Sequence, residues 1–218
     1  LMGFINAQVI ISCGAMTQAK SVFITFGLSS VYSALALLYT GGVTQHMSYL
    51  NSSVTLYKLM GSGRVGFVSV SFILFLICMG ILHIFLSKTK TGREICLTGA
   101  NMTASELAAI PVKRRVTLIF MLSGVFAALG AIVLFSRITT ASPLLGANYD
   151  TNAILAVVVG GTSLVGGRGS VIRTMLGVML VTLLANCLNL LGVSTYMQAI
   201  CKGLVLIVAI WLDRRRVK

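Results

Sequence analysis

Residues 91–115, TGREICLTGANMTASELAAIPVKRR, form the longest polar interval between the apolar runs of this chain. Thr103 and Glu106 have the spacing of a capping box, in which the threonine hydroxyl accepts from the Glu106 amide and the glutamate side chain reaches back to the Thr103 amide. Pro111 would clash with the carbonyl four residues earlier, so the helix is expected to end near Ala109. The interval therefore predicts a helix of less than two turns, which is too short to be stable alone in water.

Basic side chains flank this predicted helix on both sides. They are Lys88, Lys90 and Arg93 before it, and Lys113, Arg114 and Arg115 after it. A short helix held between two membrane spans on a positively charged face is suited to binding by a partner protein. We therefore expect residues 104–109 to be a contact site.

The composition indicates a membrane protein. Of the 218 residues, 57% are hydrophobic and only 10% are charged, whereas soluble domains carry about 25% charged residues. The net charge of +13 raises the possibility of a nucleic-acid partner. However, the basic residues gather at the ends of apolar runs, which is the pattern that sets membrane topology. No nucleic-acid partner is therefore expected.

The apolar runs predict an all-α, polytopic transmembrane helix bundle that forms a single domain over residues 1–218. About seven membrane segments are expected: Leu1–Met16, Ser21–Tyr39, Gly66–Leu86, Val116–Ser136, Asn152–Val165, Thr174–Leu191 and Tyr196–Leu212. The third would be about 31 Å long as a helix, which matches the hydrocarbon core. The first has the character of the end of a span whose beginning is missing, and Gly160-Gly161 interrupts the fifth, which is expected to be short or broken.

The distribution of basic residues predicts the orientation of these segments. Strict alternation places Lys20, the 87–115 loop, the 166–173 turn and the C-terminal tail on one side, which then holds 13 of the 17 basic residues. Because basic residues favour the cytoplasmic side, residues 87–115 are predicted to be a cytoplasmic loop.

Motifs for catalysis and cofactors fail on inspection. Residues 61–66 match G-x-G-x-x-G, but no strand precedes them and no acidic residue follows at the required distance. Residues 161–166 resemble half of a phosphate-binding loop, but Gly167 and Arg168 stand where lysine and a hydroxyl residue are needed. The five cysteines and two histidines have no metal-ligand spacing. We expect no enzyme activity, metal or cofactor.

Polar residues within the apolar segments could line a translocation pathway. Thr182, Asn186 and Asn189 fall on one helical stripe, as do Gln198 and Lys202 on the last segment. The first stripe could instead hold helices together through hydrogen bonds, because the same residue types serve both roles. The ammonium group of Lys202 could also extend to the membrane surface. Gly124 and Ala128, and Ala156 and Gly160, are pairs that allow close helix packing.

Several blocks of the sequence resemble the permeases of ribose-type ABC transporters. Residues 152–169, NAILAVVVGGTSLVGGRG, are similar to the AIAAVVLGGTSLAGGKG block of that family, and residues 188–198 to its LNLLGVSSYYQ block. Residues 37–42 resemble its LLYTGG segment. Residues 92–104 resemble the GR…GGNEAA segment, which forms the coupling helix of the family, although Met102-Thr103 stand where EA is usual.

The resemblance implies a membrane permease subunit in the bacterial cytoplasmic membrane that works as a dimer with a second permease copy or paralogue. It implies a cytoplasmic ABC ATPase that grips the coupling helix, a periplasmic or extracellular sugar-binding protein, and contact with membrane lipid. The coupling contact would involve Gly99, Asn101, Thr103, Ala104, Glu106, Leu107 and Ile110. The possible pathway would involve Asn152, Thr182, Asn186, Asn189, Gln198 and Lys202, with Asn152 standing where the family commonly has aspartate.

Two other functions stay open at this point. One is a permease for another small solute, such as an autoinducer or a branched-chain amino acid. The other is a truncated membrane protein that does not transport, because the family usually has further spans ahead of Leu1. The chain could be a fragment or a naturally short protein, and the sequence does not name the sugar.

Overall fold

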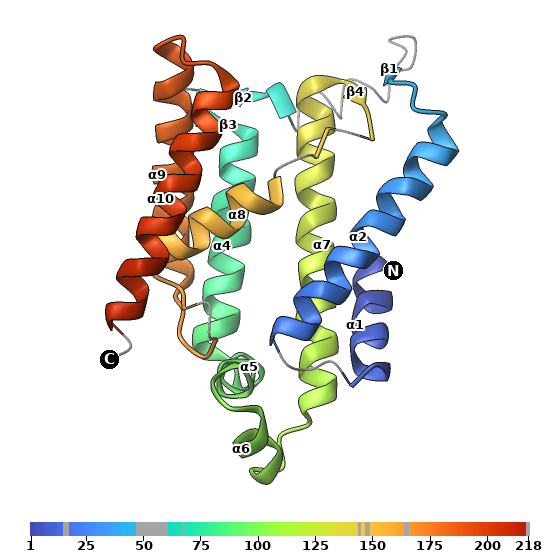
Figure 1. Ribbon diagram of the computed structural model, residues 1–218, viewed down its shortest axis with the longest axis vertical. Coiled ribbons are helices and arrows are strands. Elements are labelled where there is room, and N and C mark those ends of the chain that lie inside the picture. The colour runs from blue at the N-terminus through green and yellow to red at the C-terminus, as the bar shows by residue number, and fades with distance from the viewer. Residues whose placement is uncertain are drawn as a thin grey trace. The chain divides into compact units, whose positions relative to one another are not determined.

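The computed structural model describes residues 1–14, 18–46, 61–66, 68–143, 145–146, 149–163 and 166–216. These residues are mostly helical, as expected. The helices are α1 (Met2–Ser12), α2 (Gln18–Thr40), α4 (Val70–Lys88), α5 (Lys90–Ala100), α6 (Met102–Leu107), α7 (Val112–Ile138), α8 (Tyr149–Val159), α9 (Val171–Leu190) and α10 (Thr195–Arg216). The strands are β1 (Gln45–His46), β2 (Arg64–Val65), β3 (Val68–Ser69) and β4 (Thr140–Ala141). Figure 1 shows these elements in sequence colours.

Among the described residues, four helices, α2, α4, α7 and α9, are long and apolar enough to cross a membrane. Three apolar helices are shorter: α1, α8 and the 195–211 part of α10. The prediction of a polytopic helical membrane protein is therefore confirmed, while the count of about seven spans stays a prediction. The predicted break in the fifth segment is also confirmed, because α8 is only 11 residues long and ends before Gly160.

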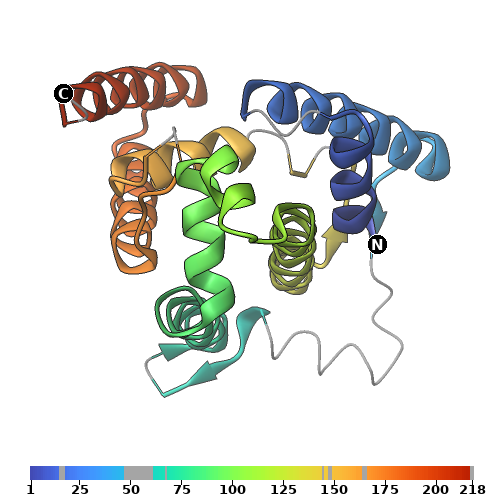
Figure 2. The ribbon, with the colours of Figure 1, turned by 90° about the horizontal axis from the view of Figure 1, so that it is seen from below.

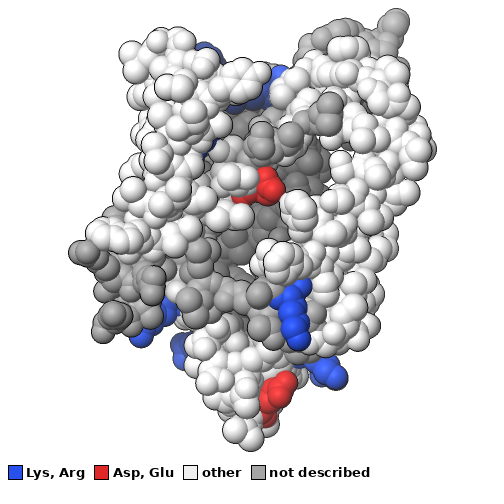
Figure 3. Space-filling model, in the orientation of Figure 1, with Lys and Arg blue, Asp and Glu red and all other residues white. Residues whose placement is uncertain are grey.

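The surfaces of these helices are apolar. Among the described residues, eight hydrophobic side chains are buried, and α4 buries none of its 19 residues. On the face shown in Figure 3, Lys, Arg, Asp and Glu form small separate patches within a surface that is mostly of other residue types. Apolar surface of this extent would be unstable in water and is typical of helices that face lipid.

Contacts divide the chain into two compact units. The first comprises Leu1–Cys78 and Ala109–Gly146, and its main packing is that of α1 against α7 (Figure 1). A Cβ added to Gly3 would overlap the Phe120 carbonyl oxygen, and one added to Gly124 would lie 3.3 Å from the Gly3 Cα. Only glycine permits this approach, so the small residue predicted at position 124 does serve close helix packing.

Two small antiparallel ladders belong to the same unit. β1 pairs with β4, where Gln45 lies opposite Ala141 and the Thr140 hydroxyl is 3.3 Å from Nδ1 of His46. β2 pairs with β3. Thr139, with φ of 56°, ends α7 in a left-handed conformation and directs the chain into β4. Residues 47–60, between β1 and β2, lie outside the described residues.

The second unit comprises Met79–Ala108 and Ala147–Lys218, and α8 packs within it against α9 and α10 (Figure 1). Leu155, Ala156 and Val181 form its buried cluster. A Cβ on Gly160 would lie 2.6 Å from the Arg173 carbonyl oxygen, so the predicted Ala156–Gly160 pair also serves close packing.

Gly161 explains why α8 stops where it does. Its φ is +76°, a conformation that costs glycine little. Its amide donates to the Val158 carbonyl at 2.9 Å, and the Thr162 amide donates to the Val157 carbonyl at 3.2 Å. This pair of bonds is a Schellman motif, which satisfies the last free carbonyls of the helix.

The loop predicted over residues 87–115 is more ordered than expected. It contains α5, an 11-residue helix that the sequence pattern does not predict. The Thr89 side chain caps this helix by accepting from the Gly92 amide at 3.0 Å. Threonine three residues ahead of Gly92 was the available signal, but two glycines within the segment lower its helix propensity.

Candidate functional site

The candidate coupling site is a corner between α5 and α6, and Asn101 forms it. This residue is the C-cap of α5 and also the N-cap of α6, with an extended backbone at φ −156° and ψ 109°. Its amide donates to the Leu97 carbonyl at 3.1 Å, and its side-chain oxygen accepts from the Ala104 amide at 3.0 Å. One residue therefore ends one helix and begins the next.

The predicted capping box is wrong. The helix starts at Met102, so Thr103 already lies inside its first turn and has no end to cap. The Asn101 amide oxygen takes that place, as expected for a residue that ranks among the strongest N-caps. Within the described part of the chain, the Glu106 carboxylate makes no hydrogen bond and is exposed to solvent.

The predicted short length of α6 is confirmed. The helix has six residues, less than two turns, and ends at Leu107, two residues before the predicted end. The Ala108 amide closes it by donating to the Ala104 carbonyl at 3.0 Å. Ala109, at φ +58°, then turns the chain toward Pro111, which caps the start of α7.

The two faces of α6 differ in exposure. Ser105 is buried, and its hydroxyl donates to the Asn101 carbonyl at 2.8 Å. Leu107 is 86% exposed, and Thr103, Ala104 and Glu106 are exposed beside it. Ile110 is partly buried. Most of the predicted coupling residues thus lie together at one exposed corner, and Leu107 presents an apolar side chain there.

Two glycines fix α5 at both ends. Gly92 lies against the end of α4, where an added Cβ would be 2.6 Å from the Leu86 Cα. Gly99 lies against the turn after α8, where an added Cβ would be 3.0 Å from the Gly167 nitrogen. The two glycines are seven residues apart and so share one helical face. Figure 2 shows α5 running from the end of α4 to that turn.

The turn after α8 has its own requirement for glycine. Gly166 and Gly167 have φ values of +94° and +72°. A Cβ on Gly166 would lie 2.5 Å from the Gly99 carbonyl oxygen, and one on Gly167 would lie 2.5 Å from the Ala100 Cβ. Both the backbone conformation and the available space therefore exclude larger residues.

The residues predicted for a pathway lie at several places in the second unit. Thr182, Asn186 and Asn189 are exposed on one face of α9. The Thr182 hydroxyl donates to the Val178 carbonyl of its own helix at 2.8 Å, and it makes no hydrogen bond to a second helix among the described residues. Asn152, in α8, is partly buried. These positions do not test the predicted pathway.

The two polar residues of α10 have different surroundings. The Gln198 side-chain amide donates to the Val193 carbonyl at 2.9 Å and so supports the turn between α9 and α10. Lys202 is partly buried. Gln198 therefore stabilises a turn, while a pathway role for either residue stays a prediction.

In the part of the first unit that the structure describes, two cavities stand out, and none of the predicted site residues lines either. One, of about 540 Å³, lies where α2 and α7 end, with Gln45, Phe135 and Thr140 in its wall. The other lies along α7. Within the described ranges, no three His, Cys, Asp or Glu side chains come together to hold a metal ion.

Comparison with known proteins decides the family. Residues 1–210 match the family described as the permease component of the branched-chain amino acid transport system. The chain belongs to this permease family. The prediction of a permease-family membrane protein is thus confirmed, and the chain is a multi-pass protein of the cytoplasmic membrane.

Curated relatives of this permease chain are named for sugars. The ribose import permease protein RbsC of Bacillus subtilis is 37% identical over 192 residues, 88% of this chain and 59% of that protein. RbsC of Haemophilus influenzae is 34% identical over 215 residues, 98% of this chain and 64% of that protein. The xylose transport system permease protein XylH of H. influenzae is 39% identical over 142 residues, 65% of this chain and 38% of that protein.

The permease chain spans less than two thirds of the length of each of these relatives. No solved structure matches it. The resemblance to ribose-type permeases read from residues 152–169 is confirmed by the sequence relatives.

Proposed function

We propose that this chain is part of the membrane permease subunit of a binding-protein-dependent ABC importer for a ribose-like monosaccharide. The family match and the relatives named for ribose and xylose import support this proposal. The partners would be a cytoplasmic ABC ATPase, an extracytoplasmic sugar-binding protein and a second permease copy or paralogue.

The observation that carries the coupling role is the exposed corner at α6. Leu107 projects an apolar side chain that is 86% exposed from a helix too short to be stable alone. A partner that covers Leu107 would stabilise both the side chain and the helix. We assign this role to the ATPase, and we place residues 87–115 on the cytoplasmic side because most basic residues then lie there.

The contacts of α5 suggest how movement of α6 would reach the membrane helices. α6 joins α5 at Asn101, and α5 contacts the end of α4 through Gly92 and the turn after α8 through Gly99. Closure of the ATPases would shift the corner between α5 and α6. This shift would move α4 and α8 between two packing arrangements, which is alternating access. ATP acts by favouring the packing that fits the closed ATPases.

The solute would pass polar side chains of the second unit. The exposed Asn186 and Asn189 of α9 are the strongest candidates, because neither amide is hydrogen-bonded within the described chain. Thr182 and Asn152 would lie beside them on the pathway, and Lys202 would supply a charge within the membrane. Gln198 would act through the turn that it stabilises.

The proposal is tested by copurification. The full protein that carries this chain is expressed with the ABC ATPase encoded beside its gene, either unchanged or as Glu106→Pro. Proline at position 106 would break α6, whereas Glu106→Ala would retain it. At equal membrane expression we expect a stable complex for the unchanged protein, a weaker complex for Glu106→Ala, which lacks one contact side chain but retains the helix, and loss of the complex for Glu106→Pro.

Uptake then tests the solute. Proteoliposomes that hold the complex and the cognate binding protein should take up labelled ribose only with ATP. A well-folded protein that binds no ATPase would favour the non-transporting alternative. ATP-driven uptake of leucine instead of ribose would favour the amino-acid alternative, to which the family description itself points.

A further inference from the structure

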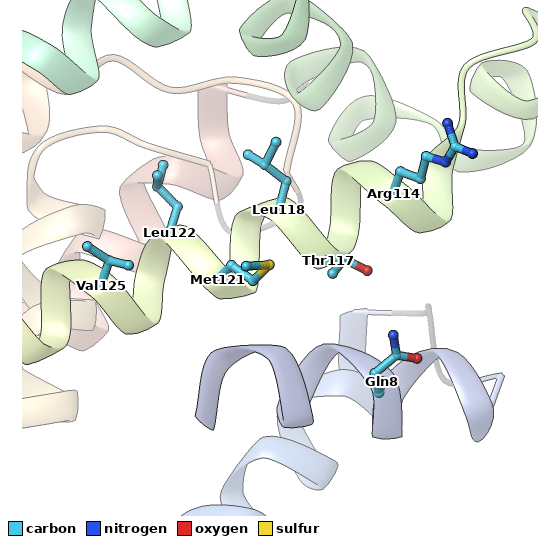
Figure 4. Close-up of a pocket in the computed structure, with 7 residues that line it drawn as sticks. All are labelled: Gln8, Arg114, Thr117, Leu118, Met121, Leu122 and Val125. Atoms are coloured by element: carbon cyan, nitrogen blue, oxygen red, sulfur yellow. The ribbon is translucent and has the colours of Figure 1, made fainter. Parts of the chain in front are cut away.

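A groove of about 570 Å³ runs along α7 beside α1. Its polar lining residues are Gln8 of α1 and Arg114 and Thr117 of α7. Its apolar lining residues are Leu118, Met121, Leu122 and Val125 of α7. Figure 4 shows Gln8 projecting from α1 toward α7, and the other side chains spaced along α7 from Arg114 to Val125.

The groove is polar at one end and apolar along the rest. Its α7 residues follow one helical face, with the charge in the first turn and apolar side chains in the next turns. Val125 lies eleven positions after Arg114, a rise of about 16 Å along the helix. One leaflet of the hydrocarbon core is about 15 Å thick, so the groove matches the length of a single lipid chain.

The polar end attracts anions. Arg114 and its neighbour Lys113 are exposed, and the first turn of α7 has no acidic residue. The free amides at the start of the helix add a partial positive charge. The guanidinium fork of Arg114 and the side-chain amide of Gln8 are available donors, since neither is hydrogen-bonded in the described chain. The Thr117 hydroxyl already donates to the Lys113 carbonyl at 3.0 Å.

The wall of the groove is fixed in place. α1 contacts α7 through the backbone at Gly3, where an added Cβ would be 3.2 Å from the Met121 Cα. This glycine contact leaves no room for α1 to approach α7 more closely. A ligand therefore meets a wall that is already formed, which reduces the entropy lost on binding.

We propose that this groove binds one phospholipid with an anionic head group, taken from the leaflet that Arg114 faces. The phosphate contacts Arg114 and Gln8, and one acyl chain lies along the apolar row that ends at Val125. A zwitterionic lipid binds more weakly, because its own ammonium group lies beside Lys113 and Arg114. This proposal does not depend on transport.

Native mass spectrometry of the purified protein tests it, with equal amounts of phosphatidylglycerol and phosphatidylethanolamine as probes. The unchanged protein should retain one phosphatidylglycerol in preference to phosphatidylethanolamine. Arg114→Gln should lower that retention about fivefold, the effect of one basic residue near an anionic lipid surface.

Arg173→Gln is the matched control. Arg173 is also an exposed arginine and also the third residue of a long helix, α9, but it does not line the groove. It should leave retention unchanged. Equal loss in both variants would mean general charge attraction and would refute the site, as would equal retention of the two lipids.

A second variant tests the apolar part without changing the charge. Met121→Trp should fill the groove and abolish the retention of phosphatidylglycerol. The gel-filtration profile of the protein should stay unchanged. Met121→Cys tests whether something other than lipid fills the groove. Its maleimide labelling is measured above the labelling of the unchanged protein, which has five native cysteines. Added phosphatidylglycerol should slow its labelling by a membrane-permeant maleimide. A cysteine that stays unlabelled after delipidation would mean that a protein segment fills the groove, which overturns the proposal.

Discussion

Gly99 in the last turn of α5 and Gly167 in the turn after α8 are in backbone contact, with room for no side chain between them. A Cβ on Gly99 would lie 3.0 Å from the Gly167 nitrogen. The predicted coupling segment and the glycine-rich block of residues 152–169 are thereby parts of one structure. A shift of the coupling segment would therefore act directly on the 166–167 turn through this contact.

Gly99→Ala should therefore weaken transport without removing the ATPase contact. The backbone of Gly99 is helical, so alanine fits locally, but its methyl group displaces the 166–167 turn at a cost of about 1 kcal/mol. We expect ATP-driven uptake to fall roughly fivefold, which corresponds to that energy. The complex with the ATPase should be retained on copurification. Gly80→Ala in α4 is the control, because an added Cβ there would meet no described atom outside its own helix backbone within 4 Å. Equal uptake by both variants would contradict the role of the contact.

Asn101→Ala should loosen the start of α6. Loss of the side-chain acceptor leaves the Ala104 amide unbonded and costs about 1 kcal/mol. Hydrogen exchange of the 104–105 amides should become about fivefold faster. Asn101→Asp keeps the acceptor and should keep the protection, and Thr103→Ala should change nothing. Faster hydrogen exchange in Thr103→Ala than in Asn101→Ala would show that Thr103, not Asn101, caps the helix, as the capping-box prediction stated.

Leu107→Ser should weaken ATPase binding while leaving the fold intact. The side chain is 86% exposed, so the isolated permease loses little packing when it is removed. A buried apolar anchor at an interface is worth about 2 kcal/mol, a change of roughly 30-fold in the dissociation constant. Titration of the ATPase onto immobilised protein measures the change. Leu191→Ser, which is 77% exposed at the end of α9, should bind like the unchanged protein.

Gly3→Ala should destabilise the first unit. Its methyl group would overlap the Phe120 carbonyl oxygen and force α1 away from α7, at a cost of about 1–3 kcal/mol. The midpoint of unfolding in detergent should fall by several degrees. Gly130→Ala in α7 should not lower the midpoint, because an added Cβ there would meet no described atom outside its own helix backbone within 4 Å. If both variants unfold at the same temperature, α1 does not depend on this contact.

Asn186→Leu should reduce uptake without changing assembly. The residue is exposed on α9, and its amide has no hydrogen-bond partner within the described chain. Loss of a polar group that contacts the solute costs about 1–3 kcal/mol, so uptake should fall about tenfold. The oligomer size should stay constant on gel filtration, and Cys187→Ala should transport normally. A smaller oligomer with Asn186→Leu would indicate that the stripe joins helices instead.

Much of the fold could be predicted because membrane helices are marked by long apolar runs. The predicted second, fourth and sixth segments overlap α2, α7 and α9 almost fully, since no polar interval interrupts them. The end of α8 followed from Gly160-Gly161, whose backbone freedom suits a helix C-terminus. The close packing at Gly124 followed from its small size.

The interior of the polar interval was harder to predict. α5 contains Gly92 and Gly99, which lower helix propensity, and it is stabilised by contacts with α4 and the 166–167 turn. Such contacts join residues far apart in the sequence, so local patterns do not reveal them. Asn101 and Thr103 are both acceptable N-caps, and the choice between them depends on where α5 ends.

Asn101 also determines how far α6 can reach. It is the one residue between two helices, so in the proposed coupling it would be the pivot of a lever whose arm is the six residues of α6, about 9 Å long. Rotation of about 10° at this pivot moves the far end of the arm by only about 1.5 Å, which is the scale of helix shifts in switching proteins. A displacement this small can be transmitted only if α6 is held rigidly. The hydrogen bonds from Asn101 to both helices limit the movement of α6 relative to α5.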